Sequence, residues 1–317
     1  MSFDVIDPGD DWNEQERQIS ARRMAQYSAE AIAAARDVTR KYVLFPELKT
    51  VLAAFDRVYQ LSRDLNLPQG VLVTGPPGSS KTSVADYFMR SLPPAADVVE
   101  GFGAVYLRMR PGISAGLLVS QFLNAVRHPL TYVRHDRVAS MRDIACEALR
   151  HKGTRLVFVD EAQCLSPRSR ARMTEDRDTS VCNLLREVMD RSRVALVLLA
   201  DHRMPELEQV DRALADRVSV RVSLAYFGND STWASFLGEL ARSVKTVSLV
   251  HLGDESIRSA THAATGGCRR TAMRLVTEAV LVAIDAKASV VERSHFQIAF
   301  QRAAGPGHMV QNPYGNH

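Results

Sequence analysis

Several features that define other classes of protein are scarce or missing in this 317-residue sequence. No apolar run approaches the roughly 18 residues that a membrane-spanning helix needs, so we expect no membrane span. Residues 1–7 carry acidic side chains and lack the basic region of a secretory signal, so we expect a cytoplasmic protein. The cysteines lack the paired spacing of a metal site, and reduced thiols in a cytosolic protein are the simplest interpretation. They are Cys146, Cys164, Cys182 and Cys268.

A strong net charge is missing as well. The formal net charge of +4 does not by itself predict a nucleic-acid partner. The charge is uneven, however, because residues 4–16 contain several acidic side chains and no basic one. Basic side chains gather later, at 108–110, 168–172 and 269–274. Each of these clusters is compatible with a solvated surface, and together they permit a DNA-binding surface without requiring one.

What the sequence does contain is a glycine-rich segment between a predicted strand and a predicted helix. Residues 70–74 are apolar and residues 83–89 have helical character, which is the context of a phosphate-binding loop. Backbone N–H groups of such a loop face the phosphates of ATP, Lys81 adds a positive charge, and Thr82 offers its hydroxyl to Mg²⁺. The nucleotide-binding residues we expect are Gly75, Pro76, Pro77, Gly78, Ser79, Ser80, Lys81, Thr82 and Ser83.

Ser80 departs from the usual motif, in which glycine precedes the lysine. A serine keeps the backbone N–H donor, but its dihedral angles are less free and its Cβ atom could crowd a phosphate. A chance turn rich in glycine and proline is the alternative interpretation of an imperfect loop.

A second motif begins at Arg155, where four apolar residues precede Asp160 and Glu161. Such a run predicts a strand buried on both faces of a parallel sheet, and ligands collect at the carboxyl ends of such strands. We expect Asp160 to hold Mg²⁺ and Glu161 to orient the attacking water as a catalytic residue, together with Lys81. An ordinary acidic strand end is the alternative. Two motifs in this order favour ATP binding, with ATP hydrolysis as the expected activity.

Strands and helices alternate through the first two thirds of the chain, which predicts a parallel α/β sheet. We expect strands at 70–74, 104–109, 156–160, 194–200 and 218–224. We expect helices at 20–37, 46–65, 83–89, 115–126, 141–151 and 181–191, and a polar, unburied segment at 165–179. Only helices are expected afterwards, at 231–242, 254–265, 269–287 and 294–303.

This pattern suggests four parts. They are an acidic N-terminal arm and helix (1–40), an αβα ATPase core (41–227), a helical lid (228–303) and a flexible C-terminal tail (304–317).

The two motifs and the order of elements resemble the AAA+ family of ATPases over roughly residues 40–303. The resemblance implies an αβα parallel-sheet core followed by a small all-helical lid. It also implies an arginine finger that reaches the neighbouring subunit's nucleotide, and Arg217 matches its position before the last core strand. An arginine suits this role because its guanidinium is always charged and planar. Arg212 is the alternative.

The same resemblance implies two sensor residues near the γ-phosphate. The sensor-1 position falls at the polar end of the strand at 194–200, where we prefer His202 to Asp201. The sensor-2 position falls at the start of a lid helix. Arg270 matches it best, and Arg269 is not separated from it by the pattern.

Further passages resemble the transposition regulators of the TniB, TnsC and MuB type. They are residues 160–163, residues 213–220, the single compact lid and the helical lead-in to the phosphate loop. The resemblance implies a homo-oligomeric ring or filament on double-stranded DNA that recruits a transposase and answers to a target-selection protein of the TniQ type. Secretion-linked ATPases of the ExeA type share similar passages, so an ATPase acting on a protein partner without DNA is the alternative. A nucleotide-dependent scaffold with little turnover also stays open because of Ser80.

Basic connections supply the candidate DNA contacts. They are Arg108, Arg110 and Ser114 after the second strand, and Arg168 and Arg170 after the Asp160 strand. The prediction rests on their place in these connections and on no base-reading motif. Contacts of this kind go to phosphates, carry no sequence code and depend strongly on salt.

Overall fold

The computed structural model describes residues 27–92, 103–166, 175–304 and 311–315. The described residues divide between two compact units. One unit takes its residues from Leu44–Tyr226 and Cys268–Arg270, and the other from Met1–Val43, Phe227–Gly267 and Thr271–His317.

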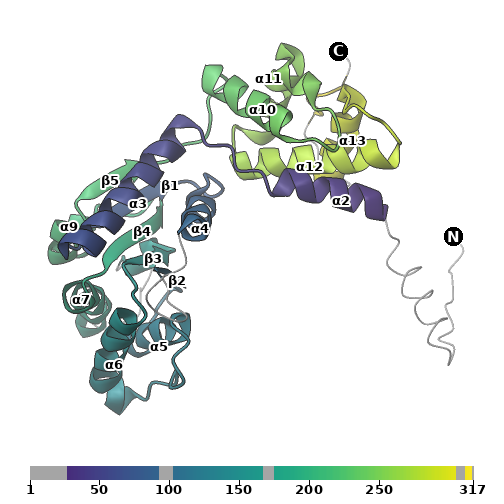
Figure 1. Cartoon of the computed structure of the whole chain (residues 1–317). Coiled ribbons are helices and arrows are strands. Elements are labelled where there is room, and N and C mark those ends of the chain that lie inside the picture. Colours follow the sequence, from purple (N-terminus) through teal and green to yellow (C-terminus); the bar gives the residue numbers. More distant parts are fainter. Residues whose placement is uncertain (1–26, 93–102, 167–174, 305–310, 316–317) are drawn as a thin grey trace, which may run out of the picture. The chain divides into compact units, whose positions relative to one another are not determined.

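The first unit is built on a five-stranded sheet in the order β2-β3-β4-β1-β5, with every neighbouring pair parallel (Figure 1). The central strands β3 and β4 are almost completely buried, as their unbroken apolar runs predict. The edge strands β2 and β5 instead alternate in burial. The strands are β1 (Gly70–Gly75), β2 (Ala104–Arg108), β3 (Leu156–Asp160), β4 (Ala195–Asp201) and β5 (Val220–Ser223).

Helices cover both faces of this sheet, as successive side chains of β3 reveal. Phe158 packs edge-on against Phe55 of α3 and near Phe88 of α4. Its neighbours Val157 and Val159 point to the opposite face and join the core formed with α5, α6, α7 and α9. The helices are α3 (Pro46–Leu65), α4 (Lys81–Ser91), α5 (Ala115–Ala125), α6 (Val138–His151), α7 (Glu175–Ser192), α8 (Leu207–Val210) and α9 (Arg212–Arg217), with short 3-10 turns η1 (His135–Arg137) and η2 (Ala162–Leu165).

The second unit is helical among its described residues, apart from one isolated β-bridge between Ser248 and Val290. This confirms the predicted αβα sheet followed by a helical region. Its helices are α2 (Ala29–Thr39), α10 (Ser231–Ser243), η4 (Val250–Gly253), α11 (Glu255–Thr265), α13 (Arg293–Ala304) and all but the first two residues of α12 (Arg269–Asp285).

Some expected elements differ in extent. Ser28 caps α2 through its side chain, so this helix begins at Ala29; residues 20–26 of the helix expected at 20–37 lie outside the described residues. Helix α6 starts at Val138, before the expected residue 141. Leu165 and Ser166 are buried, which corrects the prediction of an unburied segment 165–179 at these two positions; the burial of residues 167–179 lies outside what the structure describes.

Helix α2 packs with the helical unit, whereas the sequence grouped it with a separate N-terminal part. Ala31 and Ala35 form a small cluster with Leu281 of α12. The backbone N–H of Ser28 also donates a hydrogen bond to Asp285, at 3.0 Å. The alanine-rich face of α2 is therefore a packing surface.

The C-terminal residues 311–315 are held in place, which corrects the expectation of a flexible tail at these positions. Tyr314 is 1% exposed, and its ring stacks on Phe296 with centroids 5.4 Å apart. Its hydroxyl donates to Thr261 at 2.8 Å. The guanidinium of Arg293 donates to the carbonyl oxygens of Pro313, Tyr314 and Gly315.

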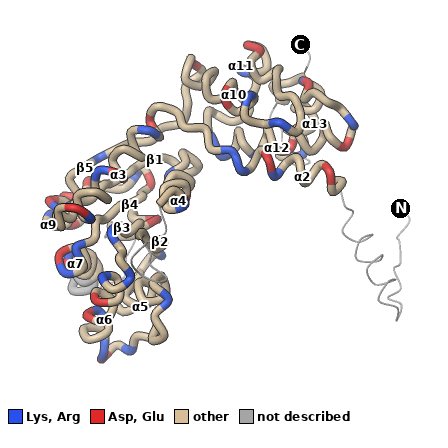
Figure 2. Tube along the Cα trace, viewed as in Figure 1, with Lys and Arg blue, Asp and Glu red and all other residues tan. Residues whose placement is uncertain are grey.

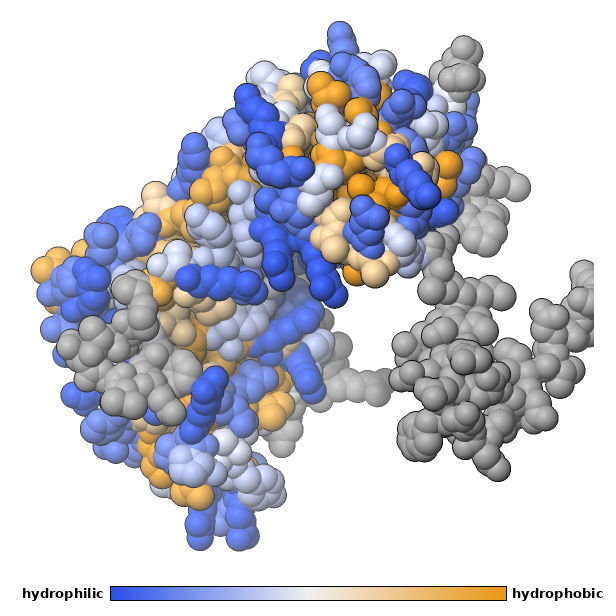
Figure 3. Space-filling view, turned by 45° about the vertical axis from the view of Figure 1, so that its right-hand side comes forward, coloured by the Kyte–Doolittle hydropathy of each residue, from blue (hydrophilic) through white to orange (hydrophobic). Residues whose placement is uncertain are grey.

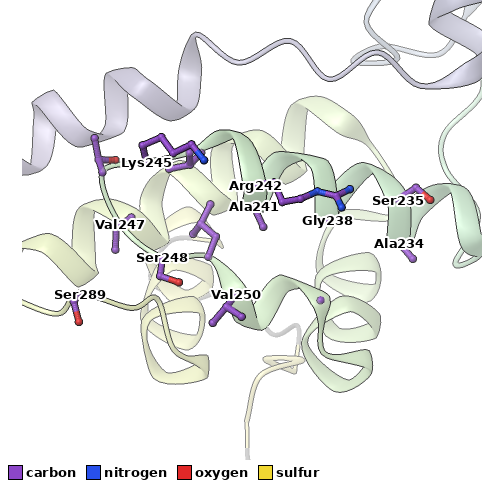
Figure 4. Close-up of a pocket in the computed structure, with 14 residues that line it drawn as sticks. Ala234, Ser235, Gly238, Ala241, Arg242, Lys245, Val247, Ser248, Val250 and Ser289 are labelled. Carbon is purple, nitrogen blue, oxygen red and sulfur yellow. The ribbon is translucent and has the colours of Figure 1, made fainter.

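An open groove of about 1010 Å³ lies in the helical unit between α10 and the segment that follows it (Figure 4). Small side chains such as Ala234 and Ala241 line it, with Arg242 and Lys245 as its only charged residues.

Hydrophobic residues lie scattered among hydrophilic ones over the face seen in Figure 3. Among the described helices, none is both long and apolar enough to cross a membrane.

Candidate nucleotide-binding site

The carboxyl ends of four parallel strands meet at one edge of the sheet. In the strand register Gly75 lies opposite Asp201, and Arg108 lies opposite Asp160. Because β3 pairs with β4 and β4 with β1, the phosphate loop after β1 lies near the acidic pair that ends β3. This is where open α/β folds bind ligands.

The loop has the backbone that phosphate binding requires. Gly78 and Ser80 have φ angles of 85° and 86°, in the left-handed region. A Cβ atom on Gly75 would lie 2.4 Å from the carbonyl oxygen of Leu224, so only glycine fits there. Helix α4 starts directly afterwards at Lys81, so its unpaired N–H groups face the loop. Ser80 therefore occupies a conformation that costs an L-residue about 1–2 kcal/mol.

Lys81 lies over this loop. Its ammonium donates hydrogen bonds to the carbonyl oxygens of Gly75 at 2.6 Å and Pro76 at 3.0 Å. Burial lowers the pKa of Lys81, while Asp201, Asp160 and Glu161 oppose this effect. An incoming phosphate group would add negative charge beside this partly desolvated ammonium.

Asp160 and Thr82, the two expected Mg²⁺ ligands, are in contact. The Thr82 hydroxyl donates to Asp160 Oδ2 at 2.9 Å, and the backbone N–H of Glu161 donates to Asp160 Oδ1 at 2.9 Å. Asp160 is 5% exposed. Among the described residues no group of three or more His, Cys, Asp or Glu side chains forms a metal site. A hydroxyl beside a carboxylate nevertheless fits Mg²⁺, which takes few protein ligands and completes its shell with phosphates and water.

Tyr106 of β2 is a member of this site that the sequence analysis missed. Its hydroxyl donates to the same Asp160 oxygen that Thr82 contacts. Burial and the hydrogen bond to Asp160 both raise the pKa of Tyr106. The local sequence gave no signal for this residue, because the contact depends on β2 being the neighbour of β3.

Glu161 is held through both carboxylate oxygens. Its backbone is left-handed, with φ 58°. Arg108 donates to Oε1 at 3.1 Å, and the side-chain amide of Gln163 donates to Oε2. Gln163 in turn accepts the backbone N–H of Asp201 at 2.9 Å, so it links Glu161 to the end of β4.

Of the expected DNA contacts, Arg108 lies next to this site, and Arg110 and Ser114 follow it in the connection to α5. Arg108 is exposed and forms an ion pair with Glu161, so it contacts the acidic pair directly. Arg110 is exposed, and Ser114 caps the start of α5. Arg168 and Arg170 lie outside the described residues.

The expected sensor residues lie at the edges of the loop. The backbone N–H of His202 donates to the Gly75 carbonyl at 3.1 Å, and its ring lies 3.3 Å from the Asp201 carboxylate. Arg270 donates its backbone N–H to the Gly78 carbonyl at 3.3 Å. Arg269 donates to the Ser80 hydroxyl at 3.4 Å. Both arginines therefore remain candidates for the sensor-2 role.

Arg217 is engaged within its own subunit. Its guanidinium forms two hydrogen bonds with Asp190 of α7, at 3.0 and 2.7 Å, and a third with the carbonyl of Ala213. Arg212 lies on the same short helix α9 and is exposed, without a recorded side-chain partner among the described residues. The finger residue predicted from the sequence would have to leave Asp190 before it could reach a neighbouring nucleotide.

Comparison with known proteins identifies relatives of this chain at two levels. A family model described as "Bacterial TniB protein" matches residues 35–225. No curated protein sequence matches the chain.

Among solved structures, the chain is similar to the Aeropyrum pernix ORC2 protein in its ADPNP-ADP complexes, with TM-score 0.64, 18% identity, and coverage of 84% of this chain and 71% of that one. It is also similar to the Aeropyrum pernix ORC1 protein in complex with DNA, with TM-score 0.60, 20% identity, and coverage of 85% and 68%. A third similar structure is Drosophila ORC bound to DNA, with TM-score 0.54, 16% identity, and coverage of 96% of this chain and 70% of that one. These likenesses establish an AAA+ fold.

Proposed function

The chain belongs to the TniB family, and on that premise we propose that it is an ATP-dependent, DNA-binding regulator of transposition. In this proposal it is a cytoplasmic protein that binds ATP with Mg²⁺ and assembles as a homo-oligomeric ring or filament on double-stranded DNA. The assembly recruits a transposase and answers to a target-selection protein of the TniQ type. Slow ATP hydrolysis limits the lifetime of the assembly.

The observation that carries the ATPase part is the contact between Thr82 and Asp160 at the mouth of the phosphate loop. With ATP bound, the loop N–H groups and Lys81 would hold the β- and γ-phosphates. Thr82 and Asp160 would hold Mg²⁺, which supplies charge neutralisation on the phosphate oxygens. Glu161 would orient the attacking water, and His202 and Arg270 would face the γ-phosphate.

The proposal includes a homo-oligomer because an arginine finger acts on the nucleotide of a neighbouring subunit. A guanidinium stabilises the γ-phosphate only when it reaches the site from a correctly docked neighbour. Arg217 would exchange its own Asp190 for the neighbour's phosphates, and Arg212 is the alternative finger. ATP binding would therefore favour the oligomer, and hydrolysis would weaken it.

The DNA part is supported by basic and exposed residues around α5. Arg108, Arg110 and Ser114 precede or cap this helix. The connection from α5 to α6 adds Arg134 and Tyr132, which is 83% exposed. Figure 2 shows Lys and Arg residues along this connection between α5 and α6. Two structural neighbours are described as bound to DNA, which supports a DNA partner for this chain in general.

Arg108 also offers a physical link between DNA and hydrolysis. Its guanidinium donates a hydrogen bond to Glu161. A DNA phosphate would compete with Glu161 for that guanidinium, because both are anionic acceptors. DNA contact would then free one oxygen of the catalytic carboxylate, and we expect DNA to stimulate ATP hydrolysis.

Exchange of Arg110 for Glu tests the DNA surface. Arg110 lies outside the contacts of the acidic pair, so we expect R110E to weaken DNA binding at least tenfold and to leave ATP binding unchanged. The matched control is Arg150→Glu, an exposed arginine at the end of α6. Fluorescence anisotropy of labelled duplex DNA with a non-hydrolysable ATP analogue measures both variants. Unchanged DNA affinity of R110E at low salt would refute this placement, and oligomers that ignore DNA would favour an ATPase acting on a protein partner.

A further inference from the structure

Tyr106 differs from its neighbours on β2 in where its side chain ends. Val105 and Leu107 on either side are each 3% exposed and belong to the core between the sheet and helices α5, α6, α7 and α9. Tyr106 points to the other face, together with Arg108, because side chains alternate along a strand. Its hydroxyl reaches across to the Asp160 carboxylate at the end of the adjacent strand.

The carboxylate of Asp160 is nearly inaccessible to water and depends on protein donors. Among the described residues three groups donate to it, namely the Thr82 hydroxyl, the Glu161 backbone N–H and the Tyr106 hydroxyl. Thr82 has a second task, because its oxygen is an expected Mg²⁺ ligand. The N–H of Glu161 holds Oδ1 only. Tyr106 is therefore the donor to Oδ2 that is not itself an expected Mg²⁺ ligand.

We propose that Tyr106 is a positioning residue for the metal, and that its hydroxyl fixes the Asp160 carboxylate in the orientation that holds Mg²⁺ with the bound nucleotide. The proposal rests on the proposed ATP-binding function. Partners that orient a metal-binding carboxylate influence metal affinity almost as strongly as the ligands do, by about 10- to 100-fold. Tyr106→Phe keeps the aromatic ring and removes only the donor, so it isolates this contribution.

The test measures metal binding directly in the full-length protein. Mn²⁺, which substitutes for Mg²⁺ and is visible by electron paramagnetic resonance, is titrated into protein saturated with a non-hydrolysable ATP analogue. We expect Y106F to weaken Mn²⁺ binding about 10-fold or more. Binding of a fluorescent ATP analogue in EDTA should stay within about twofold of wild type, because the loop N–H groups and Lys81 are untouched.

Two further variants keep the result specific. Tyr59→Phe removes a hydroxyl from α3 that lies beside Gly103, at the opposite end of β2 from Arg108, which pairs with Asp160 in the sheet; we expect wild-type Mn²⁺ affinity. Asp160→Asn removes the charge that Tyr106 orients, so adding Y106F to D160N should weaken Mn²⁺ binding no further.

The outcomes separate this inference from the proposed function. Wild-type metal affinity in Y106F, in a protein that binds Mn²⁺ and nucleotide normally, would overturn the positioning role and leave the ATP site intact. An equal loss of nucleotide binding in EDTA would also overturn it, because it would mark Tyr106 as a general structural residue. A wild-type protein that binds no nucleotide would instead refute the proposed function.

Discussion

Ser80 permits the sharpest energetic prediction for this protein. Its φ of 86° lies in the left-handed region, which costs an L-residue about 1–2 kcal/mol and glycine almost nothing. Relief of this strain by glycine would stabilise the fold. Glycine also loses more backbone entropy on folding, which reduces the expected stabilisation by about 0.5–1 kcal/mol. The hydroxyl adds little, since its contact with Arg269 is long at 3.4 Å. We expect S80G to stabilise the protein by about 0.5–1 kcal/mol, or about 1–4 °C in Tm.

Thermal unfolding followed by circular dichroism measures this change. The matched control, measured without nucleotide, is Ser83→Gly, the same substitution at a helical position in the first turn of α4 whose φ angle is not positive. There glycine lowers helix propensity, so we expect a loss of about 0.5 kcal/mol. Opposite signs at the two serines would support the argument. A loss of stability in S80G equal to that in S83G would refute the claim that Ser80 is strained.

Four further predictions concern the site and its supports. Glu161→Gln should lower ATP hydrolysis at least about 100-fold while ATP stays bound and the oligomer accumulates, as phosphate release and light scattering would report; an unchanged rate would identify a scaffold. Gln163→Ala should lower kcat without changing nucleotide affinity, because it frees Glu161 from the end of β4; an unchanged kcat would contradict this. Asp190→Ala should release Arg217 and shift ATP-dependent assembly to lower protein concentration in analytical ultracentrifugation, at a cost below about 1 kcal/mol; weaker assembly would indicate that the pair is structural. Tyr314→Phe should destabilise the helical unit by about 1 kcal/mol through loss of the Thr261 hydrogen bond, measured by thermal unfolding, and an unchanged Tm would contradict that.

Much of the sheet was predictable because its strands are buried on both faces. A strand such as β4 reads as an unbroken apolar run, and the phosphate loop after β1 carries its own signature. The acidic pair at the end of β3 also follows from sequence alone. Local patterns of this kind need no knowledge of what lies beside them.

The residues that escaped prediction depend on neighbours that are distant in sequence. Tyr106 reaches Asp160 only because β2 lies beside β3 in the sheet. The local sequence of neither strand indicates which strand will be its neighbour. Tyr314 sits in a Gly- and Pro-rich stretch that predicts flexibility, yet its ring is buried against Phe296. Helix α2 likewise packs on α12, although the two helices lie far apart in the sequence.

Electron microscopy of the purified protein with double-stranded DNA tests the central claim most directly. Samples with and without a non-hydrolysable ATP analogue are compared, and DNA alone serves as the blank. The account predicts regular rings or filaments on DNA only when the nucleotide is present. Nucleotide-dependent oligomers that exclude DNA, or DNA complexes that form equally well without nucleotide, would contradict it.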